Sequence, residues 1–169
     1  MLETFFNFDI EEDIEVGEVS IKKSSLGHYS FDINGIYYLT DFIVYATNFC
    51  KLTSFKFNSI LIGGLGLGIA PYFLENKTNV VDIDIVDNNM NVITAIHKMN
   101  HLKKSNIIYS DFFTYKTEKT YDLILVDLWW IKGLNFEDEK KKILDHYHDN
   151  VNQYGGIYFP ITDELFQKE

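Results

Sequence analysis

The sequence predicts an α/β fold, a doubly wound and mainly parallel sheet of about five strands preceded by a small β-hairpin unit. Apolar runs of strand length alternate with helical stretches over the last two thirds of the chain. Nearly continuous apolar strands are typical of a parallel sheet that helices cover on both faces. Earlier in the chain, the Asn34-Gly35 pair separates two alternating apolar runs, which is the strongest local signal for a hairpin.

The composition is that of a globular domain. The chain has 169 residues, of which 46% are hydrophobic and 24% charged, the usual balance for such a domain. A chain of this length buries on the order of 70% of its unfolded surface, so its stability requires neither a disulfide nor a metal. The single Cys50 excludes an internal disulfide. We see no signal peptide and no membrane-spanning run, and we expect a cytoplasmic protein without a membrane partner.

The net charge of the chain limits the kinds of partner that we expect it to bind. The chain carries 25 acidic against 15 basic residues, for a net charge of −10, and such a surface repels phosphate backbones. All of its basic residues are lysines, so the bidentate fork that arginine offers to phosphates and guanines is missing. We therefore expect a cationic or neutral small-molecule substrate and no nucleic acid.

Residues 1–50 are predicted to form an acidic segment, a hairpin and a linking helix. Seven acids fall within the first 18 residues, which we interpret as a solvated face. Apolar residues at spacings of three and four predict a helix over 42–50. The predicted strands are 19–24, 28–33 and 36–41.

Residues 51–169 are predicted to form the doubly wound unit. In such a sheet, ligands bind outside the carboxyl ends of the strands, where the strand order reverses. The residues just after each strand therefore matter most. The predicted strands are 59–64, 80–87, 106–111, 121–127 and 155–161, and the predicted helices lie near 69–76, 90–103 and 137–152.

A glycine-rich loop follows the first of these strands, with glycines at 63, 64, 66 and 68. Glycines let the backbone approach a ligand closely before a helix begins. Asp87 ends the next strand, 19 residues after Gly68, close to the spacing of about 20 that places a carboxylate on a ribose diol. Ile69 stands where a dinucleotide site requires its third glycine. The pattern predicts a nucleoside ligand other than NAD.

The third and fourth strands also end in acids, Asp111 and Asp127. Either one alone is best interpreted as a turn or helix-capping residue. Together with the glycine loop and Asp87, they place a glycine loop and three acids at four successive strand ends. This regularity favours a functional role.

Four motifs, SILIGGLGLG, IVDNNMNVI, IIYSDFF and YDLILVD, resemble the cofactor-binding motifs of the class I S-adenosylmethionine-dependent methyltransferase superfamily. The resemblance is closest to its spermidine synthase-like branch, whose hairpin and helix start are similar to LGHYSFDINGIYYLTDFIVYA. It implies a Rossmann-like fold, S-adenosylmethionine or its decarboxylated form as cofactor, and no metal. The implied cofactor-binding residues are Gly63, Gly64, Leu65, Gly66, Gly68, Asp87, Asn88, Asp111 and Phe112.

The resemblance also implies residue roles. Asp87 would bind the ribose hydroxyls, and Asp111 the adenine amino group, with the Phe112 backbone beside it. Asp127 would be the acid nearest the transferred group and the catalytic base that takes a proton from an attacking amine. The implied acceptor pocket consists of Asp41, Tyr45, Trp129 and Trp130.

The sequence departs from the family in several places. Gly66 stands where spermidine synthases carry the acid that holds the cofactor's amino group, and Trp130 stands where they carry a second acid near the transferred group. Ile62 replaces the corresponding acid of ordinary methyltransferases. Only nine residues follow Pro160, so we expect strands 6 and 7 of the family to be missing. The apolar edge this would leave open predicts a homo-oligomer.

These observations predict a spermidine synthase-like transferase that moves a methyl or aminopropyl group to a small, amine-bearing acceptor. Methyl transfer is favoured because of the missing acids. Two alternatives stay open: a non-catalytic nucleoside-binding or assembly module, and an enzyme that cleaves the cofactor without any acceptor.

Two pairs of histidines stand close together in the sequence, and one pair is spaced like metal ligands. His97 and His101 stand four residues apart in a predicted helix, but no third ligand follows at a suitable spacing. We interpret them as exposed helix histidines, and we interpret His146 and His148 in the same way.

Overall fold

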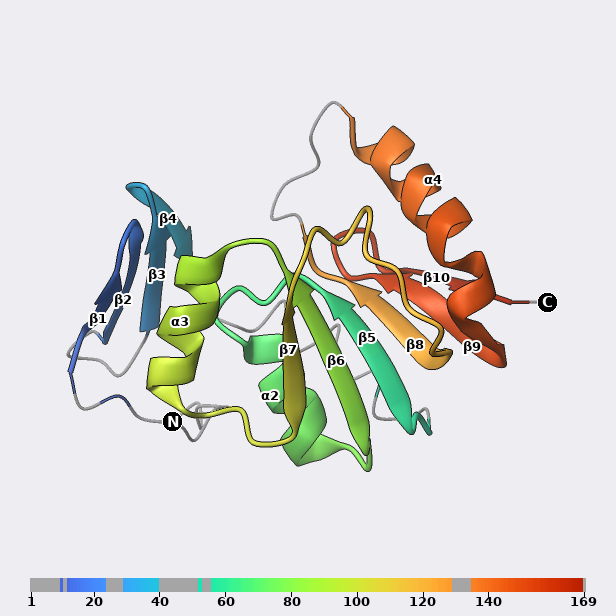
Figure 1. The fold of residues 1–169 in the computed structure, drawn as a ribbon, viewed down its shortest axis with the longest axis horizontal. Coiled ribbons are helices and arrows are strands. Elements are labelled where there is room, and N and C mark those ends of the chain that lie inside the picture. Colours follow the sequence, from blue (N-terminus) through green and yellow to red (C-terminus); the bar gives the residue numbers. More distant parts are fainter. Residues whose placement is uncertain are drawn as a thin grey trace.

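The computed structural model describes residues 10, 12–23, 29–39, 52, 56–128 and 135–168. They form two sheets (Figure 1): a four-stranded sheet in the order β1-β2-β3-β4 and a six-stranded sheet in the order β10-β9-β8-β5-β6-β7. Within this part of the chain, no helix combines the length and the apolar character needed to cross a bilayer.

The N-terminal sheet is antiparallel throughout. Positive φ angles at Asn34 (55°) and Gly35 (75°) are typical of a type I′ turn and confirm the hairpin that the sequence predicts between β3 and β4. The strand β1 is a difference from the prediction, since a solvated face was expected there. Ile14 and Val16 are partly buried while Glu15 is exposed, so a short alternating strand forms among the acids. The strands are β1 (Ile14–Val16), β2 (Val19–Lys23), β3 (Tyr29–Ile33) and β4 (Ile36–Leu39).

The central sheet is doubly wound, as predicted. Five strands are parallel, and a sixth, β10, runs antiparallel to β9. The chain runs from β5 through β6 to the β7 edge and then returns to place β8 on the other side of β5. The strands are β5 (Ser59–Gly63), β6 (Asp82–Asp87), β7 (Ser105–Tyr109), β8 (Tyr121–Val126), β9 (Val151–Phe159) and β10 (Glu164–Gln167).

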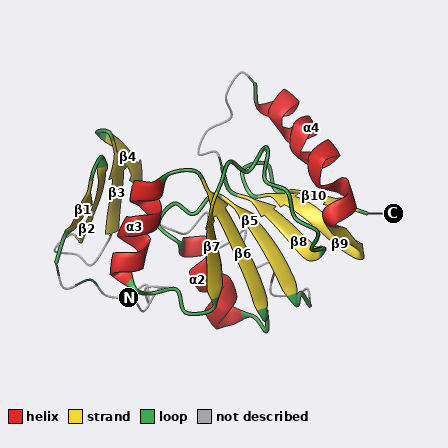
Figure 2. Cartoon of the chain, viewed as in Figure 1, coloured by secondary structure: helices red, strands yellow, loops and turns green. Residues whose placement is uncertain are grey.

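Helices cover both faces of the central sheet (Figure 2). The helices α2 (Ile69–Lys77) and α3 (Met90–Met99) pack on one face, in the same apolar cluster as Ile60 and Ile62 of β5. The helix α4 (Phe136–Tyr147) packs on the other face, with Leu61. A 3₁₀ turn, His148–Asn150, then leads into β9. The alternation along β5 thus divides its apolar residues between two cores.

The helix α3 lies between the two sheets (Figure 1). Val19, Ile21 and Phe31 of the N-terminal sheet are buried in the same apolar cluster as Val92 and Ile96 of α3. The N-terminal sheet therefore packs against the helix that follows Asp87.

Two details of the prediction were wrong. The fifth strand is not the edge of the sheet, because the chain turns after Phe159 and β10 pairs with β9 from Glu164 to Gln167. The family's C-terminal strands are thus not wholly missing. β10 and β7 are the outermost strands of this sheet, and the oligomeric state stays a prediction.

The helix α3 ends earlier than predicted. Asn100 takes a left-handed conformation (φ 53°), and its N–H bonds to the carbonyls of Ile96 and His97. His97 is exposed as predicted, but His101 lies beyond the helix and is only 6% exposed. The interpretation of His101 as an exposed helix residue was therefore wrong. The predicted helix over 42–50 lies outside the described residues.

Candidate nucleoside-binding site

The site lies where the strand order reverses, between β5 and β8. Parallel strands bring their carboxyl ends to one edge of the sheet, and this edge carries the residues after Gly63, Asp87 and Val126. Two backbone bonds hold the strand ends together: Gly64 N–H donates to the Val86 carbonyl (2.9 Å), and Asp127 N–H donates to the Gly63 carbonyl (2.8 Å). The predicted gathering of strand ends is therefore present.

The glycine loop takes a backbone path that other residues adopt with difficulty. Gly64 has a φ of 92°, and a Cβ atom there would overlap the Asp127 carbonyl oxygen. Gly68 has a φ of 75°, and a Cβ atom there would lie 2.7 Å from Nε2 of His101. Left-handed geometry and close neighbours both require glycine at these two positions.

Asp87 connects the glycine loop to the start of α3. Its Oδ2 accepts a hydrogen bond from Leu65 N–H (2.8 Å), and its Oδ1 accepts one from Asn89 N–H (2.7 Å). Burial raises the pKa of this carboxyl, and these two bonds oppose that rise. Each carboxylate oxygen can accept more than one hydrogen bond, so Asp87 retains acceptor capacity for hydroxyl groups.

A small, open pocket lies beside Asp87, with about 280 Å³ of empty space that includes open solvent. This is below the range of roughly 300 to 1,000 Å³ for small-molecule sites, so the pocket has room for only one part of a ligand. Its walls are mainly apolar, and Asp87 and Asp111 bring carboxylates to it. The lining residues are Val86, Asp87, Asn88, Asp111, Phe112, Phe113 and Leu128.

Phe112 lines this pocket, and contacts with two other elements hold it in place. Tyr147 of α4 donates its hydroxyl proton to the Phe112 carbonyl (2.6 Å), and the two rings lie 4.6 Å apart. The Phe112 ring also lies against Gly63, where a Cβ atom would be 2.8 Å away. Asp111 is exposed, and its Oδ1 accepts the Phe113 N–H (2.9 Å). With that bond Asp111 stabilises a turn, as expected for this residue taken alone. Its other carboxylate oxygen remains available to a ligand.

The structure gathers most of the predicted site residues. One edge of the sheet carries the glycine loop, Asp87, Asn88, Asp111 and Phe112. Asp127, which is partly buried, lies beside Gly64. The predicted acceptor-pocket residues are not placed, because they lie outside the part of the chain that the structure describes. These are Asp41, Tyr45, Trp129 and Trp130.

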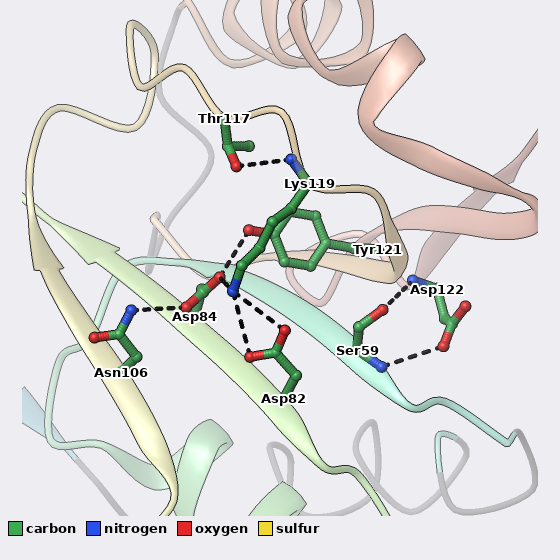
Figure 3. A network of polar contacts seen from close by, with 8 residues as sticks. All are labelled: Ser59, Asp82, Asp84, Asn106, Thr117, Lys119, Tyr121 and Asp122. Carbon is green, nitrogen blue, oxygen red and sulfur yellow. Dashed lines mark hydrogen bonds and ion pairs between the residues drawn. The ribbon is translucent and has the colours of Figure 1, made fainter.

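Sequence reasoning overlooked Asp84, a buried acid in the middle of β6. It is 1% exposed and accepts hydrogen bonds from Lys119 Nζ, the Tyr121 hydroxyl and Asn106 Nδ2, each 2.8 Å long (Figure 3). Burial raises its pKa, but the three donors outweigh that effect and hold the pKa below its usual range. Lys119 also reaches Asp82 on the strand's exposed end (3.2 Å). This cluster ties the loop before β8 to β6.

His101 was also misjudged by sequence reasoning. It is buried beneath the glycine loop, and burial lowers its pKa to about 4, so the ring is neutral at pH 7. Its ring lies 5.9 Å from that of Tyr72 on α2. The only sequence signal was its position just after Asn100, a residue type that often ends helices. Across the described residues, no group of three or more His, Cys, Asp and Glu side chains could hold a metal ion.

The fold is Rossmann-like, and several S-adenosylmethionine-dependent methyltransferases of known structure share it. One similar structure is the N-methyltransferase NodS from Bradyrhizobium japonicum with S-adenosylhomocysteine (TM-score 0.54, 15% identity, 68% of this chain and 58% of NodS). Another is the plantazolicin methyltransferase BpumL with S-adenosylhomocysteine (TM-score 0.54, 23% identity, 69% and 44% of the two chains).

A third similar structure is coclaurine N-methyltransferase bound to N-methylheliamine and S-adenosylhomocysteine (TM-score 0.53, 20% identity, 69% and 35% of the two chains). At these identities the likeness shows a shared fold. The matched region spans between about a third and three fifths of these relatives. No protein-family model and no curated protein sequence matches the chain.

Proposed function

We propose that this protein binds S-adenosylmethionine and transfers its methyl group to a small, amine-bearing acceptor. The observation that carries the proposal is the placement of Asp87. Its carboxylate joins the glycine loop to a small, mainly apolar pocket, at the switch point of a doubly wound sheet. A nucleoside fits this arrangement, with its ribose hydroxyls on Asp87 and its adenine in the pocket.

The similar structures support methyl as the transferred group and an amine as the acceptor. All three of the structures described above were solved with S-adenosylhomocysteine, the product that remains after methyl transfer, and two of them are N-methyltransferases by name. The acidic surface, with a net charge of −10, also favours a cationic acceptor over an anionic one.

The cofactor would supply an electrophilic methyl group on a sulfonium. The chain would then bind the nucleoside through Asp87, enclose adenine between Phe112 and Leu128, and hold the acceptor in line with the methyl group. Asp127 would accept the proton that the amine loses. Positioning supplies most of the rate in such a displacement, and a well-placed base contributes further.

Aminopropyl transfer is the second candidate. The observation in its favour is the antiparallel sheet that precedes the methyltransferase-like unit and packs on α3, in agreement with the resemblance of 26–46 to spermidine synthases. Against it stand Gly66, Trp130 and Ile62, where the acids of these families are missing. The other two alternatives are a binding module without catalysis and an enzyme that cleaves the cofactor.

Calorimetry and product analysis separate these functions. S-adenosylhomocysteine should bind the purified protein with a Kd below 1 mM, and NAD should bind no better than an unrelated nucleotide. The protein is then incubated with S-adenosylmethionine or its decarboxylated form, with and without diamines, and the products are identified by mass spectrometry. A methylated amine supports the proposal. An aminopropylated amine, or cofactor breakdown without acceptor, would replace it, and binding without any product would leave a binding module.

The Asp127→Asn variant tests the role of the base. We expect turnover to fall at least tenfold, while the Kd of S-adenosylhomocysteine changes little, because the acid would face the reacting centre. Asp145→Asn, on the exposed side of α4, is the matched control and should retain full turnover. Unchanged turnover in Asp127→Asn would remove this residue from the mechanism.

A further inference from the structure

A chain of hydrogen bonds joins the N-terminal sheet to the candidate nucleoside site. Glu18 lies in the turn between β1 and β2, and its Oε1 accepts a bond from Asn89 Nδ2 (3.1 Å). Its other carboxylate oxygen accepts a bond from Asn91 Nδ2. Asn89 and Asn91 flank the first residue of α3, so the turn reaches across to the start of the helix that follows Asp87.

Asn89 links this turn to Asp87. Its Oδ1 accepts the N–H groups of Asn91 (2.9 Å) and Val92 (3.1 Å) and so caps α3. Its own N–H donates to Oδ1 of Asp87 (2.7 Å). Because Asn89 Oδ1 caps the helix, Nδ2 is left to donate to Glu18. The Glu18 carboxylate thereby fixes the residue that in turn orients Asp87.

The turn is built for this close approach. Gly17 has a φ of 55°, and a Cβ atom there would overlap the side chain of Asn91. Hydrogen bonds from its own backbone and from Asn91 and Asn89 lower the pKa of Glu18, so it is ionised at neutral pH. A negative charge beside the first turn of α3 is also favoured by the helix dipole.

We propose that Glu18 is a positioning residue for the ribose-binding carboxylate of Asp87 and acts through Asn89. The N-terminal sheet then contributes to recognition of the nucleoside's ribose diol without touching the ligand. This inference rests on the proposed function, since it assumes that a nucleoside binds at Asp87.

The first experiment measures binding of S-adenosylhomocysteine by calorimetry in the Glu18→Gln variant. Glutamine keeps the size of the side chain, but its amide can match only one of the two asparagine donors. We expect the Kd to rise about three- to tenfold, the effect of one lost hydrogen bond. Glu15→Gln is the matched control, because Glu15 lies on β1 with an exposed side chain that forms a long ion pair with Lys22 (3.7 Å). Its Kd should equal that of the wild type.

The second experiment distinguishes positioning from general support of the fold. The wild type should bind adenosine more tightly than 2′,3′-dideoxyadenosine, because only adenosine offers a diol to Asp87. Glu18→Gln should reduce this preference. In the Asp87→Ala background, Glu18→Gln should change neither Kd, since its effect passes through Asp87.

The double variant Glu18→Gln/Asn91→Asp is designed as a rescue. The new carboxylate accepts from the glutamine amide, which turns the glutamine oxygen back toward Asn89. We expect both the Kd and the preference for adenosine to return to within about twofold of the wild type. If Glu18→Gln alone fails to fold, this double variant together with Asn91→Asp, which sets two carboxylates against each other, gives the same test.

The outcomes separate the two proposals. If the wild type binds neither S-adenosylhomocysteine nor adenosine, the proposed function fails. If the wild type binds and prefers the diol but Glu18→Gln keeps that preference, the positioning role is overturned. An equal loss of affinity for both nucleosides, unchanged in the Asp87→Ala background, would also overturn it.

Discussion

Asp84 and Asp87 lie three residues apart on β6 and have opposite surroundings. Asp84 is 1% exposed, and three side-chain donors from other elements bond to its two carboxylate oxygens. Asp87 ends the strand beside an open pocket, and the donors to its carboxylate are two backbone N–H groups. The surroundings shift their pKa values in opposite directions, downward for Asp84 and upward for Asp87.

The comparison shows how position along a parallel strand divides structural from binding roles. A carboxylate in the strand interior must have its hydrogen-bonding capacity met by the protein, because water cannot reach it. A carboxylate at the strand's carboxyl end can leave capacity for a ligand. We therefore expect Asp84 to act on stability and Asp87 to act on binding.

Asp84→Ala should give the largest effect on stability. It leaves the hydroxyl of buried Tyr121 without its acceptor and removes the charge that Lys119 and Asn106 meet. We expect the free energy of unfolding to fall by about 3 kcal/mol, measured by urea unfolding. Asp82→Ala is the control, because its ion pair with Lys119 is half exposed and should be worth less than about 1 kcal/mol. Equal losses in the two variants would mean that Asp84 has no special structural role.

Asp87→Ala should show the reverse pattern. We expect binding of S-adenosylhomocysteine to weaken by about 1.5 to 3 kcal/mol, the usual size of hydrogen bonds to a charged group. Calorimetry gives the change in Kd, and urea unfolding of the same variant gives its stability. A change in stability larger than the change in binding would place Asp87 in the same structural class as Asp84.

Two tyrosines that donate hydrogen bonds, one to the strand interior and one at the pocket, extend the comparison. Tyr121 donates to the Asp84 carboxylate, whereas Tyr147 donates to the Phe112 carbonyl at the pocket. Tyr121→Phe should lower the free energy of unfolding by about 1.5 kcal/mol and leave the Kd of S-adenosylhomocysteine unchanged. Tyr147→Phe should lower the free energy of unfolding by about 1 kcal/mol and also weaken binding, because Phe112 lines the pocket. Identical binding by the two variants would contradict this division.

The sequence predicted the parts of the molecule that depend on local pattern. Apolar runs located the strands, and the residues that end them, such as Gly63 and Asp87, located the candidate site. Asp84 was missed because its partners Lys119 and Tyr121 lie 35 and 37 residues away, and only the folded sheet brings them together. The strand β10 was missed because four residues, ELFQ, carry little pattern until β9 offers an edge to pair with. The environment of His101 likewise depended on where α3 stops.

Opposite pKa shifts predict opposite pH dependences for the two acids, and this is the smallest effect we expect. The folded-state pKa of Asp84 lies below its ordinary value of 3.8. The stabilisation by its charged carboxylate is therefore fully present above pH 3.8 and is lost as the pH falls through the folded-state pKa. The pKa of Asp87 lies above 3.8. As the pH rises from the ordinary pKa of 3.8 to the higher folded-state pKa, ionisation of Asp87 therefore disfavours the folded state.

Urea unfolding of Asp84→Asn and Asp87→Asn between pH 3 and pH 6 separates these contributions. The loss of stability in Asp84→Asn relative to the wild type should grow as the pH rises, because the wild type gains its charged, hydrogen-bonded carboxylate. The stability of Asp87→Asn relative to the wild type should instead improve over the same range, because asparagine avoids burying a charge. The amide changes hydrogen bonding at every pH, so the sign of each slope is the informative quantity. Slopes of the same sign would show that the strand interior and the strand end treat a carboxylate alike.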